Sequence, residues 1–197
     1  LAEAESALAW HASGRSAALY EPGYGTGAVT DLTRASGPYL AQANGGVLSP
    51  RGLLMVGGDE GAAEFAREAE AMGMAPLPFE EARAIVPILS PDRVTMAAHS
   101  DAARDIDTDR LIQNFLREAR GNGARIETGA RVTAIARTAG GWQAEAPKGP
   151  LSGRILVNAA GAWADRVAAM AGAAPLGLRP FRRSMARIPA PSGHDVA

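Results

Sequence analysis

The residues whose types and spacing could do chemistry are concentrated in one run, residues 155–165, with the sequence ILVNAAGAWAD. Its apolar start is typical of a strand, its small residues form a corner, and Asp165 begins a helical pattern. At such a corner, backbone amides can closely approach a nucleotide phosphate or ring. Packing a strand against a helix requires small residues equally, so the run alone leaves both interpretations open.

A second glycine-rich stretch, residues 23–27 (GYGTG), has less support as a nucleotide site. A dinucleotide fingerprint needs a buried strand before it and a helix with a third glycine after it, and neither flank fits. An ordinary flexible loop is the favoured interpretation.

Metal and hydrolytic chemistry are not supported by the sequence. The three histidines lie far apart, no HExxH occurs, and no serine stands in a GxSxG or SxxK setting. A group of acidic residues lacks the glycine and the terminal glutamate of a calcium loop, and we interpret it as a solvated loop leading to a helix cap. These residues are Asp101, Asp105, Asp107 and Asp109.

The composition excludes further classes. The 197 residues are 47% hydrophobic, 20 Lys and Arg balance 21 Asp and Glu, and no cysteine is present. A formal net charge of -1 makes nucleic acid a poor partner, and the missing thiols exclude disulfides and Cys-ligated metals. No stretch approaches the roughly 20 apolar residues of a membrane helix. We expect a soluble, cytoplasmic globular protein, and the loop-like ends suggest an interior fragment.

The elements that must position the candidate residues follow from periodicity and from Gly and Pro punctuation. We expect mainly loop over residues 1–27, and a hairpin of residues 47–49 and 53–56 around Pro50-Arg51-Gly52. The expected helices are residues 28–43, 61–72, 79–86, 108–120 and 165–171. The other expected strands are residues 125–127, 132–137, 142–146, 155–158 and 178–188.

Four separated motifs occur in one order and together resemble a family. Residues 158–165 (NAAGAWAD) and 13–18 (SGRSAA) are similar to motifs of the D-amino acid oxidase-like FAD-dependent oxidoreductases. Residues 105–109 (DIDTD) and 179–184 (RPFRRS) extend the match, and the spacing resembles that of the D-arginine dehydrogenase-like members.

The resemblance implies an α+β (α/β) fold with an incomplete Rossmann-like FAD-binding part and a mixed-sheet substrate part. The FAD-binding part would comprise residues 1–45 and 107–175, and the substrate part residues 46–106 and 176–197. The family's N-terminal GxGxxG unit and its C-terminal portion would lie outside this chain.

The resemblance also implies which residues hold FAD. Glu3 falls where a carboxylate binds the adenosine ribose hydroxyls, and Val132 where the backbone contacts adenine; a frayed terminus and a plain strand residue are their alternatives. The remaining positions matched to the cofactor are His11, Ser13, Gly14, Arg15, Ser16, Ala159, Ala160, Gly161 and Trp163. Because WHASG at residues 10–14 also resembles a segment in which histidine carries FAD covalently, attachment at His11 is an alternative, but we expect noncovalent binding.

On the substrate side, the resemblance matches Ser16, Tyr24 and Arg183, the last as the anchor of a substrate carboxylate. The alternative for Arg183 is a surface charge beside Arg182. Two departures alter the pocket: Leu19 replaces a histidine, and Leu53 replaces a glutamate. Leucines cannot pair a guanidinium, so an apolar or small amine is the expected substrate, unless Glu21 or Asp59 supplies the carboxylate.

The implied function is oxidation of the C–N bond of a D-amino acid or related amine, with FAD as cofactor and an unidentified electron acceptor. The alternatives are a 2-hydroxy acid or glycerol-phosphate dehydrogenase on the same scaffold, and a non-catalytic remnant that binds no FAD. The expected partners are a small-molecule substrate, with no nucleic acid and no metal.

Overall fold

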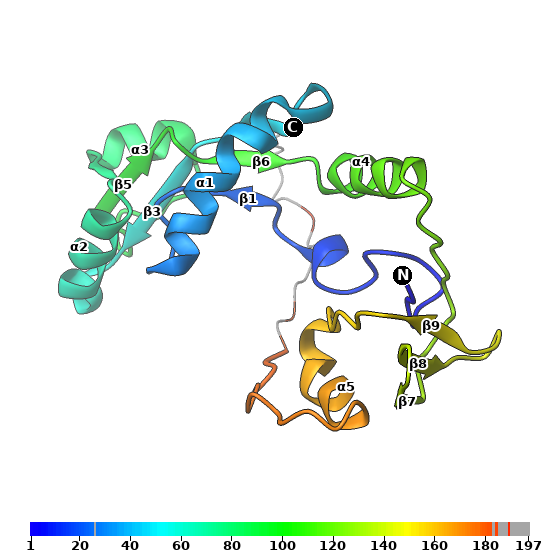
Figure 1. Cartoon of the computed structure of the whole chain (residues 1–197). Helices are drawn as coiled ribbons and strands as arrows, with labels where there is room; N and C mark the ends of the chain where they lie inside the picture. The colour runs from blue at the N-terminus through cyan, green and yellow to red at the C-terminus, as the bar shows by residue number, and fades with distance from the viewer. Residues whose placement is uncertain (26, 183, 185–188, 190–197) are drawn as a thin grey trace. The chain divides into compact units, whose positions relative to one another are not determined.

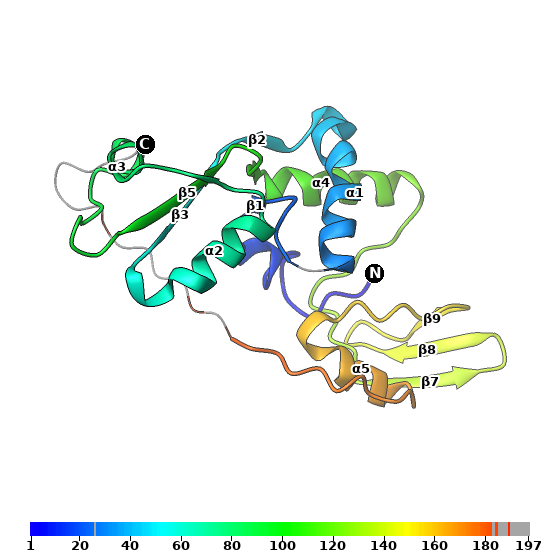
Figure 2. The same cartoon turned by 90° about the vertical axis from the view of Figure 1, so that its left-hand side faces the viewer.

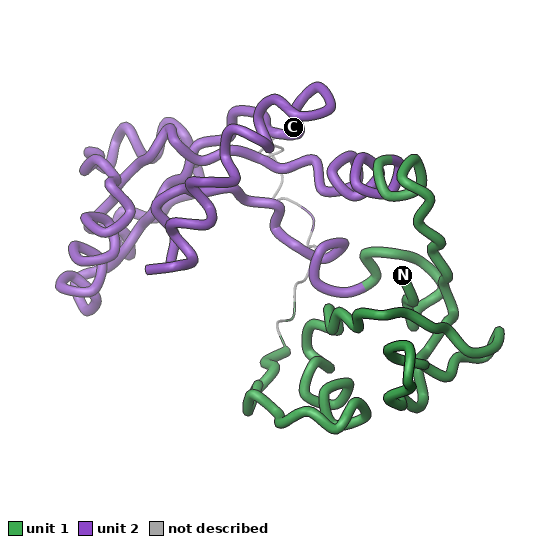
Figure 3. The backbone as a smooth tube through the Cα atoms, in the orientation of Figure 1, with its two compact units in different colours: residues 1–10, 118–188 green, residues 11–117, 189–197 purple. Residues whose placement is uncertain are grey.

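The computed structural model describes residues 1–25, 27–182, 184 and 189. The chain divides into two compact units, shown in Figure 3. Unit 1 comprises Leu1–Trp10 and Glu118–Ile188, and unit 2 comprises His11–Arg117 and Pro189–Ala197. These units follow from compactness alone, so the division into a FAD-binding part and a substrate part stays a prediction.

The first sheet of unit 2 joins three short segments that lie far apart in the sequence. Its order is β1 (Leu19–Tyr20), β6 (Arg104–Ile106) and β2 (Leu48–Pro50), and both pairings are antiparallel. Asp105 is in register with Leu19 on one side and with Ser49 on the other. The centre of this sheet is therefore set by long-range pairing.

The second sheet of unit 2, together with the helices and turn packed against it, contains most of the buried apolar residues of this unit. The antiparallel order is β3 (Leu53–Gly57), β5 (Met96–Ser100) and β4 (Ala75–Pro76). Helix α2 (Ala62–Ala71) packs beside β3, and α3 (Phe79–Ile85) beside β5 (Figure 1). The core cluster consists of Ala69, Met74 and Ala98, with Leu53, Met55, Phe65 and Met72 packed against it. Small side chains at its centre allow the helix and the sheet to approach closely.

The longer helices of unit 2 meet through aromatic rings. Helix α1 (Ala28–Gln42) contributes Tyr39, and α4 (Thr108–Gly121), in which the boundary between the units falls, contributes Phe115. The two rings stack with centroids 6.0 Å apart and planes 6° apart. Such a pair adds attraction beyond the area it buries.

Unit 1 is built on a meander of three antiparallel strands. These are β7 (Ala134–Thr138), β8 (Gly141–Glu145) and β9 (Leu151–Gly153), in that order. Figure 2 shows them side by side with α5 (Ala164–Met170) near β7.

The N-terminal segment of unit 1 is held in place by backbone hydrogen bonds. The amide of Glu3 donates to the carbonyl of Glu127 at 2.8 Å, and the amide of Ala130 donates to the carbonyl of Glu3 at 2.8 Å. Ala2 and Glu127 form an isolated parallel bridge. The terminus is therefore not frayed, and the role expected for Glu3 stays a prediction.

The five helices expected from the sequence are confirmed, whereas the hairpin was wrong. The strands β2 and β3 exist, but β2 pairs with β6 and β3 pairs with β5. Gly52, at φ +78°, donates its amide to the carbonyl of Ala103 at 3.2 Å. The residues between β2 and β3 thus connect the two sheets of unit 2 and do not form a hairpin turn, because each strand pairs with a strand far away in the sequence.

Two further strand expectations were wrong. Residues 155–158 form no strand, and Ile155 and Val157 are 77% and 79% exposed. Residues 125–127 contribute only the bridge at Glu127. A β-prone run becomes a strand only where an adjacent backbone edge accepts its hydrogen bonds, and the described residues offer none to residues 155–158. Of the expected strand 178–188, residues 178–182 are irregular, and residues 183 and 185–188 lie outside the described residues.

We predict that Gly46→Ala destabilises unit 2. Gly46 ends the turn after α1 at φ +72°, and an added Cβ would collide with the carbonyl oxygen of Ala41. Positive φ and this collision together cost on the order of 1 to 3 kcal/mol. Denaturant unfolding followed by circular dichroism measures the loss. Gly121→Ala is the control, since nothing lies within 4 Å of a Cβ built there; equal unfolding midpoints for the two variants would contradict the prediction.

Candidate functional site

The corner in residues 158–165 is shaped by Asn158. Its Nδ2 donates to the carbonyl of Ala164 at 2.8 Å, and its Oδ1 accepts the amide of Ala160 at 3.2 Å. Between these contacts lies the short helix η4 (Gly161–Trp163). One side chain thus holds both ends of the corner. Sequence reasoning missed this role, although an Asn before small residues is a known turn signal.

The surface of this corner is open at Gly161. This residue adopts φ +52°, and a Cβ built on it would meet no atom within 4 Å. A ligand can therefore approach the backbone there. Trp163, whose side chain is 44% exposed, closes the same short helix.

Asp165 ties the corner to the segment that follows α5. Its Oδ1 accepts the amide of Leu176, and its Oδ2 accepts the amides of Gly177 and Leu178, all at 2.8 Å. These hydrogen bonds, that from Leu176 first, lower the pKa of Asp165 below its ordinary value of 3.8, although partial desolvation opposes them.

Glu3 and Val132 belong to neighbouring segments of unit 1. Ala130, which is bonded to the carbonyl of Glu3, stands two residues before Val132. The Oε1 atom of Glu3 accepts the amide of Glu5 at 2.9 Å. The structure therefore places the segments that carry Glu3 and Val132 side by side, and the roles of these two residues at the adenosine end of FAD stay predictions.

The residues expected to contact the flavin in unit 2 lie on an exposed loop. His11 precedes the short helix η1 (Ser13–Arg15), which contains no buried residue. Ser16 follows it, and its Oγ accepts the amide of Ala18 at 3.0 Å. The hydroxyl hydrogen of Ser16 remains able to donate to a ligand.

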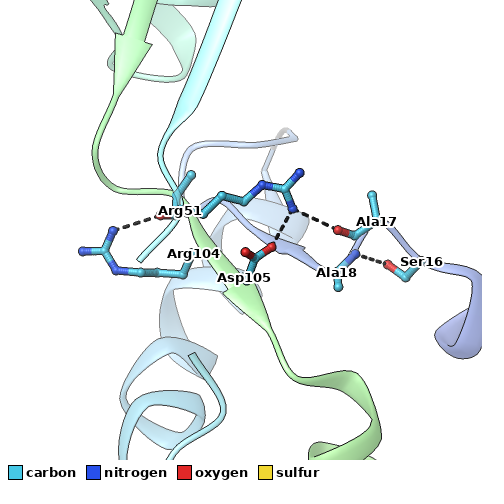
Figure 4. Close-up of polar contacts among 7 residues, drawn as sticks. Ser16, Ala17, Ala18, Arg51, Arg104 and Asp105 are labelled. Atoms are coloured by element: carbon cyan, nitrogen blue, oxygen red, sulfur yellow. Dashed lines mark hydrogen bonds and ion pairs between the residues drawn. The ribbon is translucent and has the colours of Figure 1, made fainter. Parts of the chain in front are cut away.

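A charged contact lies beside this loop, and Figure 4 shows it. The Nη1 atom of Arg51 is 2.7 Å from Oδ1 of Asp105 and 3.0 Å from the carbonyl oxygen of Ala17. Asp105 therefore lies in strand β6 and forms an ion pair, which corrects the interpretation of this residue as part of a solvated loop. Asp107 does act as expected at the start of α4, because its Oδ1 accepts the amide of Arg110 at 2.9 Å.

A cavity of about 380 Å³ has Arg51 in its wall. It is lined by Pro50, Arg51, Gly52, His99, Asp101 and Arg104. The guanidinium groups of Arg51 and Arg104 extend in opposite directions in Figure 4. Arg104 donates to the backbone carbonyls of Asp101 and Ala103. The two cations therefore do not converge on a common ligand.

The substrate-side residues are only partly placed. Tyr24 is 59% exposed and lies in the same unit as Ser16. Arg183 lies outside the described residues. Leu53 packs against the core cluster of unit 2.

Glu21 and Asp59, the two carboxylates that were considered as partners for a cationic substrate, differ in their surroundings. The Oδ1 atom of Asp59 accepts the hydroxyl of Thr95 at 2.6 Å. Glu21 is 3% exposed, and its Oε1 accepts the amide of Gly23 at 3.0 Å, while its buried Oε2 has no hydrogen-bond partner among the described residues. Asp59 is exposed, so of the two carboxylates only Glu21 places an oxygen without such a partner in a buried position.

The described residues provide neither a metal-binding cluster nor a membrane-spanning helix. They contain no group of three or more His, Asp or Glu side chains arranged to hold a metal ion. Within the same part of the chain, every helix is too short or too polar to cross a membrane.

Comparison with known proteins decides the family. All of residues 1–197 match the family described as FAD dependent oxidoreductase. The chain belongs to this family. Over 94 residues it is 33% identical to the mitochondrial dimethylglycine dehydrogenase of Homo sapiens, a match that covers 47% of this chain and 11% of that protein.

Solved structures show the same fold at low identity. Glycine oxidase from Geobacillus kaustophilus matches with a TM-score of 0.72 at 20% identity, covering 87% of this chain and 50% of that one. The FAD-bound L-alpha-glycerophosphate oxidase from Mycoplasma pneumoniae gives the same TM-score and coverage at 18% identity. This family member therefore spans about half the length of those enzymes.

The described residues fit the family's cofactor at two places. Gly161 leaves its backbone open where any larger residue would carry a Cβ, and Ser16 presents a hydroxyl on an exposed loop. At the corner, the side chain of Asn158 forms hydrogen bonds with the local backbone, and on the loop the side chain of Ser16 does the same. These hydrogen bonds preorganise both turns before a ligand binds.

We predict that Asp165→Asn loosens the segment after α5. Because the folded pKa lies below 3.8, the carboxylate stabilises unit 1 above that pH, and the stabilisation is lost as the pH falls through the folded pKa. The variant should therefore melt lower than the wild type near neutral pH, and the difference should shrink below pH 3.8. Thermal unfolding across a pH series measures this. Glu118→Gln, an exposed carboxylate on α4, is the control, and a difference independent of pH would contradict the prediction.

Proposed function

We propose that this chain is part of an enzyme that uses FAD to oxidise the C–N bond of a D-amino acid or related amine. The observation that carries the proposal is the preformed corner at residues 158–165, in a chain that matches a FAD-dependent family along its whole length. Glu3 and Val132 would hold the adenosine end of FAD. The flavin end would lie against His11, Ser13, Gly14, Arg15, Ser16, Ala159, Ala160, Gly161 and Trp163.

When bound, FAD would supply the acceptor for a hydride from the substrate carbon that carries the nitrogen. The protein residues orient the amine for this transfer: Arg183 anchors its carboxylate, and Tyr24 and Ser16 shape the amine side. As the hydride leaves, the nitrogen lone pair forms a C=N bond, and water then adds and releases ammonia or an amine. A substrate that enters with a neutral nitrogen needs no strong general base.

The fold alone does not choose between an amine and a hydroxy substrate. Glycine oxidase and L-alpha-glycerophosphate oxidase match with equal TM-scores. The amine is favoured by the 33% identity to an enzyme named dimethylglycine dehydrogenase.

Flavin binding and reduction test the proposal. The purified protein, supplied with FAD, should take up the yellow flavin absorbance, and D-amino acids or N-methylated amines should bleach it without oxygen. Acid precipitation should leave the colour in the supernatant, as expected for noncovalent FAD at His11. Protein that stays colourless would support the non-catalytic remnant, and bleaching by 2-hydroxy acids or glycerol phosphate alone would support the other dehydrogenase.

We predict that apolar substrates are preferred and that Glu21→Gln leaves this preference unchanged. Leu19 and Leu53 offer no partner to a guanidinium, and its unpaired desolvation costs several kcal/mol, or at least about 100-fold in kcat/KM against D-arginine relative to D-leucine. Glu21→Gln keeps the shape of the side chain and removes its charge, so it tests whether the buried carboxylate of Glu21 pairs with a cationic substrate and reverses the preference for apolar ones. If the wild type prefers D-arginine and Glu21→Gln abolishes that activity while D-leucine is unaffected, the pocket assignment is wrong.

A further inference from the structure

We infer that Arg51 and Asp105 are positioning residues for the loop that carries Ser16. The inference rests on the proposed function, because it assumes that residues 13–16 face the flavin. One part of the inference does not depend on FAD: the ion pair restrains the backbone conformation of Ala17 and Ala18 before any cofactor binds.

The contacts form a continuous path from the sheet to the Ser16 hydroxyl. One nitrogen of Arg51, Nη1, donates to both the Asp105 carboxylate, at 2.7 Å, and the Ala17 carbonyl, at 3.0 Å. The amide of Ile106, the residue after Asp105, donates to the carbonyl of Ala18 at 2.7 Å. The amide of Ala18 then donates to Oγ of Ser16 at 3.0 Å. Figure 4 shows Arg51 reaching to Asp105 and Ala17, with the Ala18–Ser16 contact beside them.

The loop needs such a restraint because packing does not supply one. Helix η1 contains no buried residue, and Ser16 and Ala17 are exposed. Ala18 adopts φ +56°, which is unfavourable for an L-residue with a Cβ. A strained residue in an exposed loop persists when its surroundings over-determine it, and here the surroundings are polar contacts with β6 and Arg51.

The effect of the pair is local rather than global. The side chains of Arg51 and Asp105 are 39% and 50% exposed, and ion pairs this exposed contribute little to overall stability. Removing either partner should therefore leave the fold intact and increase opening of the loop.

Trypsin reports this opening directly, since the bond after Arg15 lies in the loop. In the apo form of the full 197-residue chain, Arg51→Met and Asp105→Asn should each raise the rate of cleavage after Arg15 about fivefold. Each single substitution already removes the ion pair, so the two effects should not add. The double variant should be cleaved at about the same rate as the more rapidly cleaved of the two single variants. Mass spectrometry identifies the fragments, and melting midpoints should stay within about 2 °C of the wild type.

Arg67→Met is the matched control. Arg67 forms an exposed ion pair with Glu64 at 3.7 Å on α2 of the same unit, and its loss should not alter cleavage after Arg15. Asp105→Asn is isosteric, so it keeps the test decisive if Arg51→Met unfolds. Unchanged cleavage in Asp105→Asn, or equal acceleration in Arg67→Met, would overturn the inference.

A second measurement connects the loop to the cofactor. The Kd for FAD, from quenching of flavin fluorescence, should rise about fivefold in Arg51→Met and Asp105→Asn but not in Arg67→Met. If the wild type binds no FAD, the proposed function fails while the proteolysis result still decides whether the pair positions the loop. Faster cleavage with an unchanged Kd would overturn the link between this loop and FAD.

Discussion

Strand β6 exchanges backbone hydrogen bonds with two segments that lie far from it in the sequence, β1 on one side and β2 on the other. This pairing places Asp105 opposite Leu19 and Ser49, within reach of Arg51. The same strand also positions the loop before β1, because the amide of Ile106 donates a hydrogen bond to the carbonyl of Ala18. A strand of only three residues therefore organises the part of unit 2 that carries Ser16.

Unit 1 uses polar side chains for a similar purpose. The side chain of Asn158 forms two hydrogen bonds with backbone groups of the corner, and the side chain of Asp165 forms three with backbone amides of the segment after α5. Charge-assisted bonds of the Asp165 kind are among the stronger ones available to a backbone amide. Together, these hydrogen bonds fix the backbone of the corner and of the segment that follows α5 through two side chains.

Family membership and substrate rest on different kinds of observation. The match over residues 1–197 establishes the FAD-dependent family, and the folds of glycine oxidase and L-alpha-glycerophosphate oxidase agree with it. Substrate choice depends on a few side chains around the reacting carbon, and a shared scaffold does not carry that information. Glu21 is buried, and one of its carboxylate oxygens has no hydrogen-bond partner among the described residues, so the proposed substrate preference is tested at this residue.

The sequence by itself determined the helices, because helical periodicity and turn chemistry are local properties. The motifs at residues 13–18 and 158–165 were found in the sequence through their resemblance to motifs of the FAD-dependent family. The sequence did not determine strand partners: β2 and β3 looked like a hairpin, and residues 155–158 looked like a strand. Both errors have one cause, since a strand is defined by the edge it pairs with, and that edge can lie anywhere in the chain. For the same reason the role of Arg51 could not be predicted. Its partners, Asp105 and Ala17, lie 54 and 34 residues away, and only the tertiary structure brings them to one guanidinium nitrogen.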